Sequence, residues 1–128
     1  MGRRIADAGI RPSLIVSSPA VRAWTTARII ANEIGYPLEF LQRDSALDLA
    51  SVNGILDVVV SQDAGFNNMM LIGHNPGFTD FANYLAPGLT NNIPTAGVVS
   101  VELDTDDWSL YDKPDVTLLL YDFPKNRP

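Results

Sequence analysis

The feature that most constrains the fold is a unit that occurs twice: a short apolar run, a turn containing proline, and an amphipathic stretch. In the first unit, the largely apolar residues 13–16 lead through Pro19 into residues 20–34, where apolar side chains recur at helical spacing. In the second unit, residues 69–73 lead through Pro76 into a similar stretch. Short runs without polar alternation are typical of parallel strands buried on both faces. We therefore predict an α/β protein with a mostly parallel sheet and helices on both faces.

The remaining pattern assigns the other elements. A helix is expected to end near Ala8, and Ser51 is expected to cap a helix whose apolar side chains share one face. Further strands are expected over residues 38–41, 98–103 and 116–121, and loops over residues 44–49 and 87–94. A short acidic turn at residues 104–107 joins the last two strands as an antiparallel pair, and the tail at 124–128 is expected to fray.

Length and charge limit the classes of function. A chain of 128 residues is long enough for one domain, so we expect a single domain over 1–128. The net charge of −6 disfavours nucleic acid as a partner. The absence of cysteine excludes disulfides and thiolate metal sites. No apolar run approaches the roughly 20 residues that span a bilayer, and no secretory signal is evident, so we expect a cytoplasmic protein without a membrane partner.

Two strand-to-helix junctions are the candidate functional segments: Ser-Ser-Pro-Ala-Val-Arg at 17–22 and Gly-His-Asn-Pro-Gly at 73–77. In open α/β sheets, ligands bind beyond the carboxyl ends of the strands, where helix N-termini direct N–H groups outward. Each junction also has a plain structural interpretation. Ser17 and Ser18 are typical helix-capping residues, and a lone histidine at a strand end is more often structural than catalytic.

The two junctions together resemble the histidine phosphatase superfamily, which has the phosphoglycerate-mutase-like fold, and most closely its small bacterial phosphohistidine phosphatases. The matching segments are Ser-Ser-Pro-Ala-Val-Arg-Ala-Trp-Thr-Thr-Ala at 17–27 and Leu-Ile-Gly-His-Asn-Pro-Gly-Phe at 71–78. The resemblance implies that Arg22 grips phosphate and that His74 is the later of two active-site histidines. We assign a catalytic role to His74 and substrate binding to Arg22, Ser18 and Asn75. The family uses no metal or cofactor, so none is expected.

The sequence departs from the family at its beginning. Family members open with a strand ending in Arg-His-Gly, whose histidine attacks the phosphoryl group. No Arg-His-Gly occurs in this chain, and His74 is its single histidine. The Gly2-Arg3-Arg4 stretch matches a later helix of the family pattern. The domain is therefore expected to be N-terminally incomplete, to lack its first strand, and to be inactive alone.

Three hypotheses for function follow. The chain is part of a phosphatase acting on phosphohistidine or a small phosphomonoester, or a non-catalytic module that binds phosphate or a phosphoprotein, or a structural domain with a degenerate pocket. Phosphohistidine, including phosphohistidine carried on a protein partner, is preferred among substrates because the chain has no room for a large inserted cap. No acidic residue is evident in the sequence as a proton donor to the leaving group.

The missing strand has a consequence for the sheet. By resemblance, it lies between the strands that end at Ser17 and Gly73. We expect one of three outcomes: direct pairing of these two strands, filling of the gap by another segment or by a second copy in a homodimer, or poor solubility.

Overall fold

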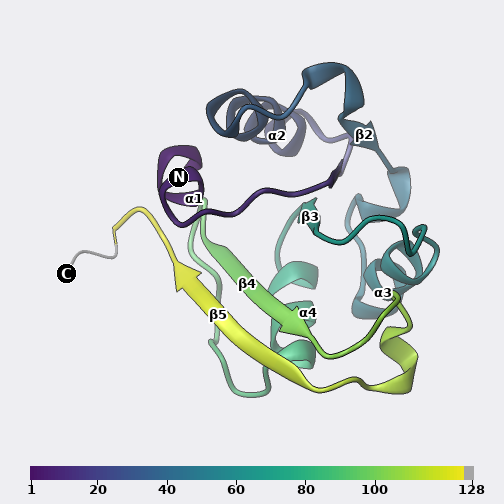
Figure 1. Cartoon of the computed structure of the whole chain (residues 1–128). Coiled ribbons are helices and arrows are strands. Elements are labelled where there is room, and N and C mark those ends of the chain that lie inside the picture. The colour runs from purple at the N-terminus through teal and green to yellow at the C-terminus, as the bar shows by residue number, and fades with distance from the viewer. Residues whose placement is uncertain (126–128) are drawn as a thin grey trace. The chain divides into compact units, whose positions relative to one another are not determined.

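Two units make up the chain in the computed structural model, which describes residues 1–125 (Figure 1). The first unit comprises residues 1–49 and 65–74, and the second comprises residues 50–64 and the chain from 75 onward. Residues 126–128, which include the end of the tail predicted to fray, lie outside the described residues. A single domain over 1–128 stays a prediction, for which an unfolding test is given below.

A three-stranded parallel sheet forms the first unit, in the order β2 (Gln42–Arg43), β1 (Leu14–Ser17), β3 (Met69–Ile72). Leu14 pairs with Met69, and Ser17 pairs with Ile72. Every residue of β1 is buried, as expected for a central strand with apolar side chains on both faces. The strands predicted at 13–16 and 69–73 are thus direct neighbours, which is the first of the three outcomes expected for the sheet.

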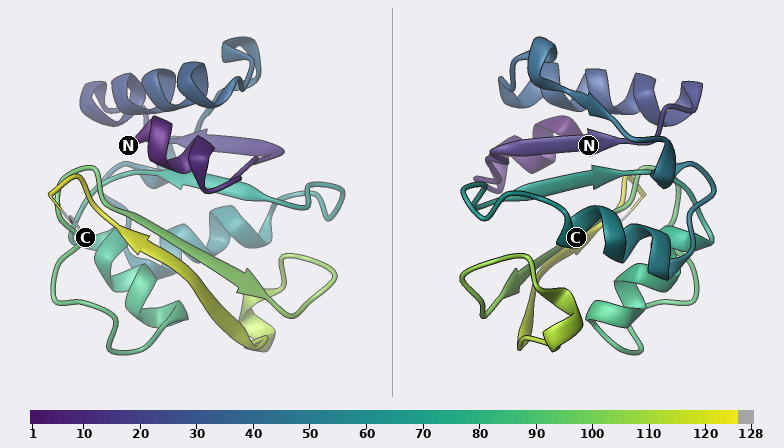
Figure 2. Two further views of the ribbon diagram at one scale, coloured as in Figure 1. Left: turned by 60° about the vertical axis from the view of Figure 1, so that its left-hand side comes forward. Right: turned by 90° about the vertical axis from the view of Figure 1, so that its right-hand side faces the viewer.

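Two helices belong to the same unit. Helix α1 (Gly2–Asp7) packs against α2 (Val21–Ile34), and α2 contacts both β1 and β3 (Figure 2). The side chains of α2 predicted to face inward are buried: Ala23, Ala27, Ile30 and Ile34. The helix ends at Gly35, whose φ of 78° is left-handed and therefore suits glycine.

The strand predicted at residues 38–41 is wrong. Residues Leu38–Phe40 form a 3-10 turn, closed by a hydrogen bond of 3.0 Å from the Phe40 N–H to the Pro37 carbonyl oxygen. Leu38 and Phe40 are 45% and 62% exposed, so no burial favours an extended conformation there. The strand begins two residues later, at Gln42, where the main chain can pair with β1.

The loop predicted at residues 44–49 contains a further 3-10 turn over Ser45–Leu47. The Asp44 carboxylate accepts a hydrogen bond of 2.9 Å from the Ala46 N–H and so caps this turn. Leu47 is fully buried and anchors the segment. The anchored turn fixes the position of the main chain at Asp48, the residue that follows it.

Helices α3 (Val52–Val60) and α4 (Gly77–Leu85) pack together in the second unit. As predicted, Ser51 caps α3, and its hydroxyl accepts a hydrogen bond of 3.3 Å from the Gly54 N–H. Gly77 at the start of α4 is buried, and a Cβ on it would overlap the Ala50 carbonyl oxygen. Only glycine permits this close approach of the two main-chain segments.

The second unit also contains the predicted antiparallel pair, β4 (Val98–Leu103) with β5 (Val116–Asp122). Their connection is longer than the short acidic turn that the sequence suggested. It runs from Asp104 to Asp115 and includes a 3-10 turn at Leu110–Asp112, where the side chain of Leu110 is buried. Burial of this apolar side chain explains why the chain does not turn back directly after Asp107.

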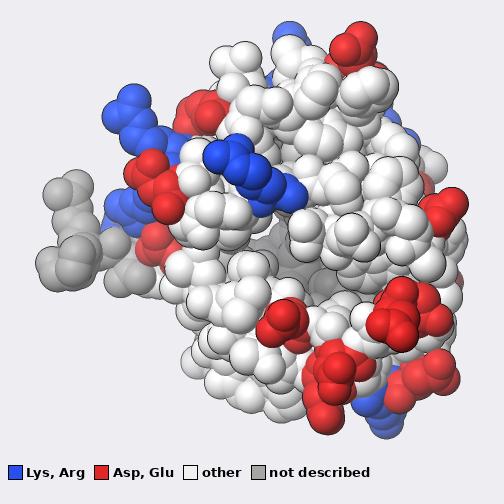
Figure 3. Space-filling model, viewed as in Figure 1, with Lys and Arg blue, Asp and Glu red and all other residues white. Residues whose placement is uncertain are grey.

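Acidic side chains gather over this connection (Figure 3), which contains Asp104, Asp106, Asp107, Asp112 and Asp115. Hydrogen bonds from the side chain and the backbone N–H of Ser109 hold the pKa of the Asp107 carboxyl below its usual value. The acidic cluster therefore behaves as a solvated, hydrogen-bonded turn.

The predicted α/β class with a parallel sheet is confirmed. In the part of the chain that the structure describes, none of the helices combines the length and the apolar character that a membrane span needs.

Candidate functional site at the carboxyl ends of β1 and β3

Ser18 follows the last residue of β1 and is fully buried. Its backbone N–H donates to the Ile72 carbonyl oxygen at 2.8 Å, which continues the pairing with β3 by one residue. Its hydroxyl oxygen accepts a hydrogen bond of 3.2 Å from the Ala20 N–H. Ser18 therefore closes the turn that leads from β1 into α2.

His74 lies two residues beyond the end of β3. Its Nε2 atom is 2.9 Å from the Ser18 hydroxyl oxygen, and 26% of its side chain is exposed. This hydrogen bond joins the two sequence motifs, which are separated by 56 positions. The junctions that the sequence predicted to meet at one edge of the sheet do meet there.

Asp48 is a third member of this group, and no sequence pattern marks it. Its Oδ1 atom is 3.9 Å from His74 Nε2, and 47% of its side chain is exposed. It comes after the carboxyl end of β2, which is parallel to β1, so its segment starts at the same edge of the sheet. The strand was predicted at 38–41 instead of at Gln42–Arg43. With the correct position, residues 44–48 directly follow the carboxyl end of a parallel strand, and they would have been candidate site residues.

Arg22 lies in the first turn of α2 with an exposed side chain. Among the described residues, no hydrogen bond or ion pair joins it to His74. Its carbonyl oxygen accepts a hydrogen bond of 2.9 Å from the Thr26 hydroxyl, within the helix. The N-cap residue Ala20 supplies no side-chain cap, so the first N–H groups of α2 have no side-chain acceptor from that residue. Convergence of Arg22 with His74 on one oxyanion stays a prediction.

Arg43 is another cation at this edge. It is the last residue of β2, and its guanidinium carbon lies 4.0 Å from the centre of the Trp24 ring on α2. A guanidinium over an indole face is held by a cation–π interaction. The stack fixes Arg43 against α2 rather than against His74.

Asn75 belongs to the second unit, where its side-chain amide is fully engaged. The Oδ1 atom accepts hydrogen bonds from the Thr79 N–H at 3.1 Å and from the Thr79 hydroxyl at 2.6 Å. The Nδ2 atom donates to Asn92 Oδ1 at 3.3 Å and to the Ile93 carbonyl oxygen at 2.9 Å. These bonds tie the start of α4 to the following loop. The role of Asn75 in substrate binding stays a prediction, and a substrate would have to replace one of these hydrogen bonds.

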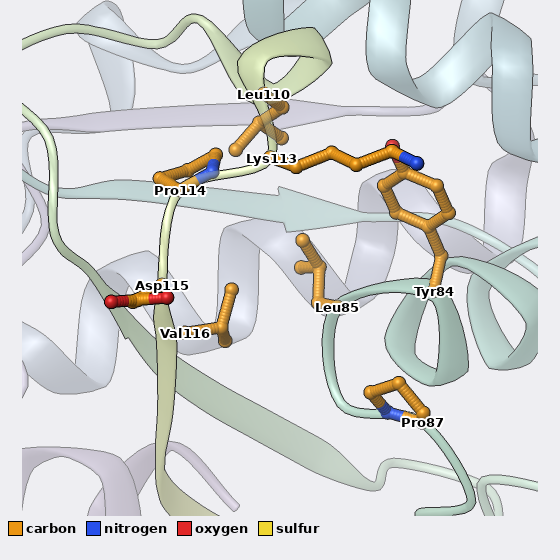
Figure 4. Close-up of a pocket in the computed structure, with 8 residues that line it drawn as sticks. All are labelled: Tyr84, Leu85, Pro87, Leu110, Lys113, Pro114, Asp115 and Val116. Atoms are coloured by element: carbon orange, nitrogen blue, oxygen red, sulfur yellow. The ribbon is translucent and has the colours of Figure 1, made fainter.

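A separate hollow of about 410 Å³ lies in the second unit (Figure 4). Its walls come from α4 and the β4–β5 connection, with Lys113 and Asp115 as its charged members. None of the residues predicted to bind substrate lines it.

Tyr111, which lies next to Leu110 in the sequence, donates a hydrogen bond of 2.6 Å from its hydroxyl to the Asp57 carboxylate, and this bond raises the pKa of the phenol. The described residues contain no group of three or more side chains suited to hold a metal ion.

Comparison with known proteins adds information about the fold. No family model and no curated protein sequence matches the chain. The solved structures that are similar to it include two that are assigned as phosphohistidine phosphatase SixA. The protein from Agrobacterium tumefaciens has 20% sequence identity and a TM-score of 0.75, over 96% of this chain and 77% of the other. The protein from Nakamurella multipartitia has 16% identity and a TM-score of 0.73, over 98% of this chain and 80% of the other. At these identities the likeness concerns the fold, and this chain therefore has the SixA-like, phosphoglycerate-mutase-like fold.

Proposed function

We propose that the carboxyl ends of β1 and β3 form a phosphoryl-binding site and that the chain is a phosphohistidine phosphatase-like protein. The observation that supports this most strongly is the 2.9 Å contact between Ser18 and His74, since it unites the two motifs on which the family resemblance rests. The fold shared with two proteins assigned as SixA is a second, independent support.

The residue types suit a phosphoryl group. An arginine fork binds two phosphate oxygens at once, and N–H groups at a helix N-terminus favour an anion. In this proposal Arg22 and the first N–H groups of α2 hold the phosphate, and His74 donates a hydrogen bond to it. Phosphoryl transfer depends mainly on such positioning and charge stabilisation.

Asp48 has a place in the same proposal. A carboxyl group near the phosphate raises the cost of binding when ionised, and when protonated it can pass a proton to the leaving group. In this proposal Asp48, whose Oδ1 atom lies 3.9 Å from His74 Nε2, is the candidate for such a proton transfer in a complete site. No sequence pattern marks Asp48 for this role.

The phosphatase activity of these 128 residues depends on whether they contain a nucleophile. The printed sequence contains one histidine and no Arg-His-Gly. In the proposed site, His74 binds the phosphate and does not attack it. We therefore propose that these 128 residues alone bind phosphate but have little or no phosphatase activity. The same observation favours the second candidate function, a non-catalytic module for phosphate or a phosphoprotein.

Calorimetric titration with inorganic phosphate tests the binding site. Arg22→Ala is expected to weaken binding by about 10- to 150-fold, because a hydrogen bond to a charged group contributes about 1.5–3 kcal/mol. The matched control is Arg28→Ala, since Arg28 is an exposed arginine of the same helix and should leave the affinity unchanged. Equal affinity in the wild type and Arg22→Ala would overturn the site assignment.

Hydrolysis of a phosphohistidine peptide, followed by ³¹P NMR, tests the second part. The chain starting at Met1 is expected to release phosphate no faster than the peptide does alone. Rapid release that is abolished by His74→Ala would show that His74 itself is the nucleophile, contrary to the proposal.

A further inference from the structure

We infer that Ser18 is a positioning residue that fixes the tautomer of His74, with the ring proton on Nδ1, rather than a ligand of the substrate. Ser18 is fully buried, and no substrate oxygen can reach its hydroxyl without rearrangement of the turn. Both of its recorded hydrogen bonds are internal: one to the Ala20 N–H at 3.2 Å and one to His74 Nε2 at 2.9 Å.

The hydrogen-bond inventory of the serine decides the direction of the second bond. A hydroxyl has one proton to donate and two lone pairs to accept with. The Ala20 N–H can only donate, so it occupies a lone pair of Ser18 Oγ. If His74 Nε2 also donated, the Ser18 hydroxyl proton would be left without an acceptor in a fully buried position, which is unfavourable. Asp48 Oδ1 lies 3.9 Å from the same nitrogen, which is beyond hydrogen-bond distance, so it does not accept a proton from Nε2. The hydroxyl therefore donates to Nε2.

This direction sets the state of the neutral imidazole. With Nε2 as an acceptor, the single ring proton resides on Nδ1. No hydrogen bond to Nδ1 is recorded within residues 1–125, and the ring is partly exposed. Nδ1 is then a donor pointing away from Ser18, and a donor is what a phosphate oxygen needs. This last consequence rests on the proposed phosphate site, whereas the tautomer itself does not.

Ser17 provides a matched control. It is the preceding residue, is equally buried, and carries the same hydroxyl group. Its hydroxyl donates to the Ser18 carbonyl oxygen at 2.8 Å and does not contact His74. A general loss of packing at the strand end would affect both serine-to-alanine variants, whereas a loss of tautomer control would affect only one.

The experiment is long-range ¹H–¹⁵N NMR of the imidazole ring at about pH 9, where histidine side chains are neutral. The chain has a single histidine, so the ring signals need no assignment. In the wild type, Nδ1 is expected at the position of a protonated nitrogen and Nε2 at that of an unprotonated one. In Ser18→Ala, both nitrogens are expected to move toward averaged positions, because both tautomers become populated. Ser17→Ala should leave them unchanged, and Ser18→Thr, which keeps a hydroxyl, should restore them.

The wild-type spectrum alone can refute the inference, even if Ser18→Ala does not fold. A proton on Nε2 in the wild type would overturn it, as would equal spectra of wild type and Ser18→Ala. Failure of phosphate to bind would remove the proposed function and leave the tautomer assignment standing. The two ideas thus fail on different measurements.

Discussion

Replacement of Gly77 by alanine tests the packing at the start of α4. A Cβ at this position would overlap the Ala50 carbonyl oxygen and lie 3.1 Å from the Ala50 carbonyl carbon. Both are main-chain atoms, which cannot move aside as the end of a side chain can. Ala50 directly precedes the Ser51 cap of α3, so relief of the overlap has to displace the start of one helix or the other.

The expected cost is about 1–3 kcal/mol, the usual range for overpacking, and its upper part is favoured because the neighbour is main chain. A domain of this size has about 5–15 kcal/mol of net stability, and 1 kcal/mol shifts its melting temperature by roughly 4 °C. Gly77→Ala should therefore lower the midpoint of thermal unfolding by roughly 4–12 °C. Circular dichroism at 222 nm and urea denaturation both measure the effect.

Gly35→Asn is the control for this experiment. Gly35 has a left-handed φ of 78° and nothing within 4 Å of its virtual Cβ. Asparagine adopts this conformation at low cost, so the change in stability should stay below about 0.5 kcal/mol. A Gly77→Ala protein as stable as the wild type would refute the close approach of α4 to Ala50.

Four further predictions concern stability and assembly. Ser51→Ala removes the cap of α3 and should cost about 1 kcal/mol in urea unfolding, whereas Ser45→Ala, at a serine with no recorded capping bond, should cost less. The depressed pKa of Asp107 gives stability that is fully present above the ordinary value of 3.8 and is lost as pH falls through the lower folded value; Asp107→Asn should flatten that part of the pH profile. If 1–128 is one domain, fluorescence and circular dichroism should report one cooperative unfolding transition, and two transitions would contradict this. Because β1 and β3 pair directly, no gap between them is left for a second copy to fill, so light scattering should give a monomer of 13.9 kDa rather than a dimer.

Most of the regular structure follows from the sequence because its signals are local. The helix at 21–34 has apolar residues at helical spacing and a glycine stop, and the strand at 14–17 is a buried apolar run with proline two residues after its end. The strand β2 has no such signal. Its two residues, Gln42 and Arg43, are exposed and pair with β1 through the main chain alone, so no side-chain pattern marks them.

The candidate site was predictable only in outline. Parallel strands imply that Ser18 and His74 meet at one edge, and their hydrogen bond confirms this. The contact of Asp48 with His74 depends on a 3-10 turn that is anchored by Leu47. This turn is too short to show a hydrophobic periodicity in the sequence. The hydrogen bonds of Asn75 depend on where the loop near Ile93 returns, and this is set by tertiary structure. Local patterns thus predict which elements meet, while tertiary contacts decide which side chains are engaged.

The most direct test of the phosphate site is to follow the His74 ring by NMR while inorganic phosphate is added. Because the chain has one histidine, any saturable shift of its ring nitrogens reports on this site. We expect a saturable shift of Nδ1 in the wild type, its loss in Arg22→Ala, and its retention in Arg28→Ala. If phosphate leaves the ring signals unchanged at concentrations where it binds elsewhere on the chain, the assignment of this edge of the sheet as a phosphoryl-binding site is wrong.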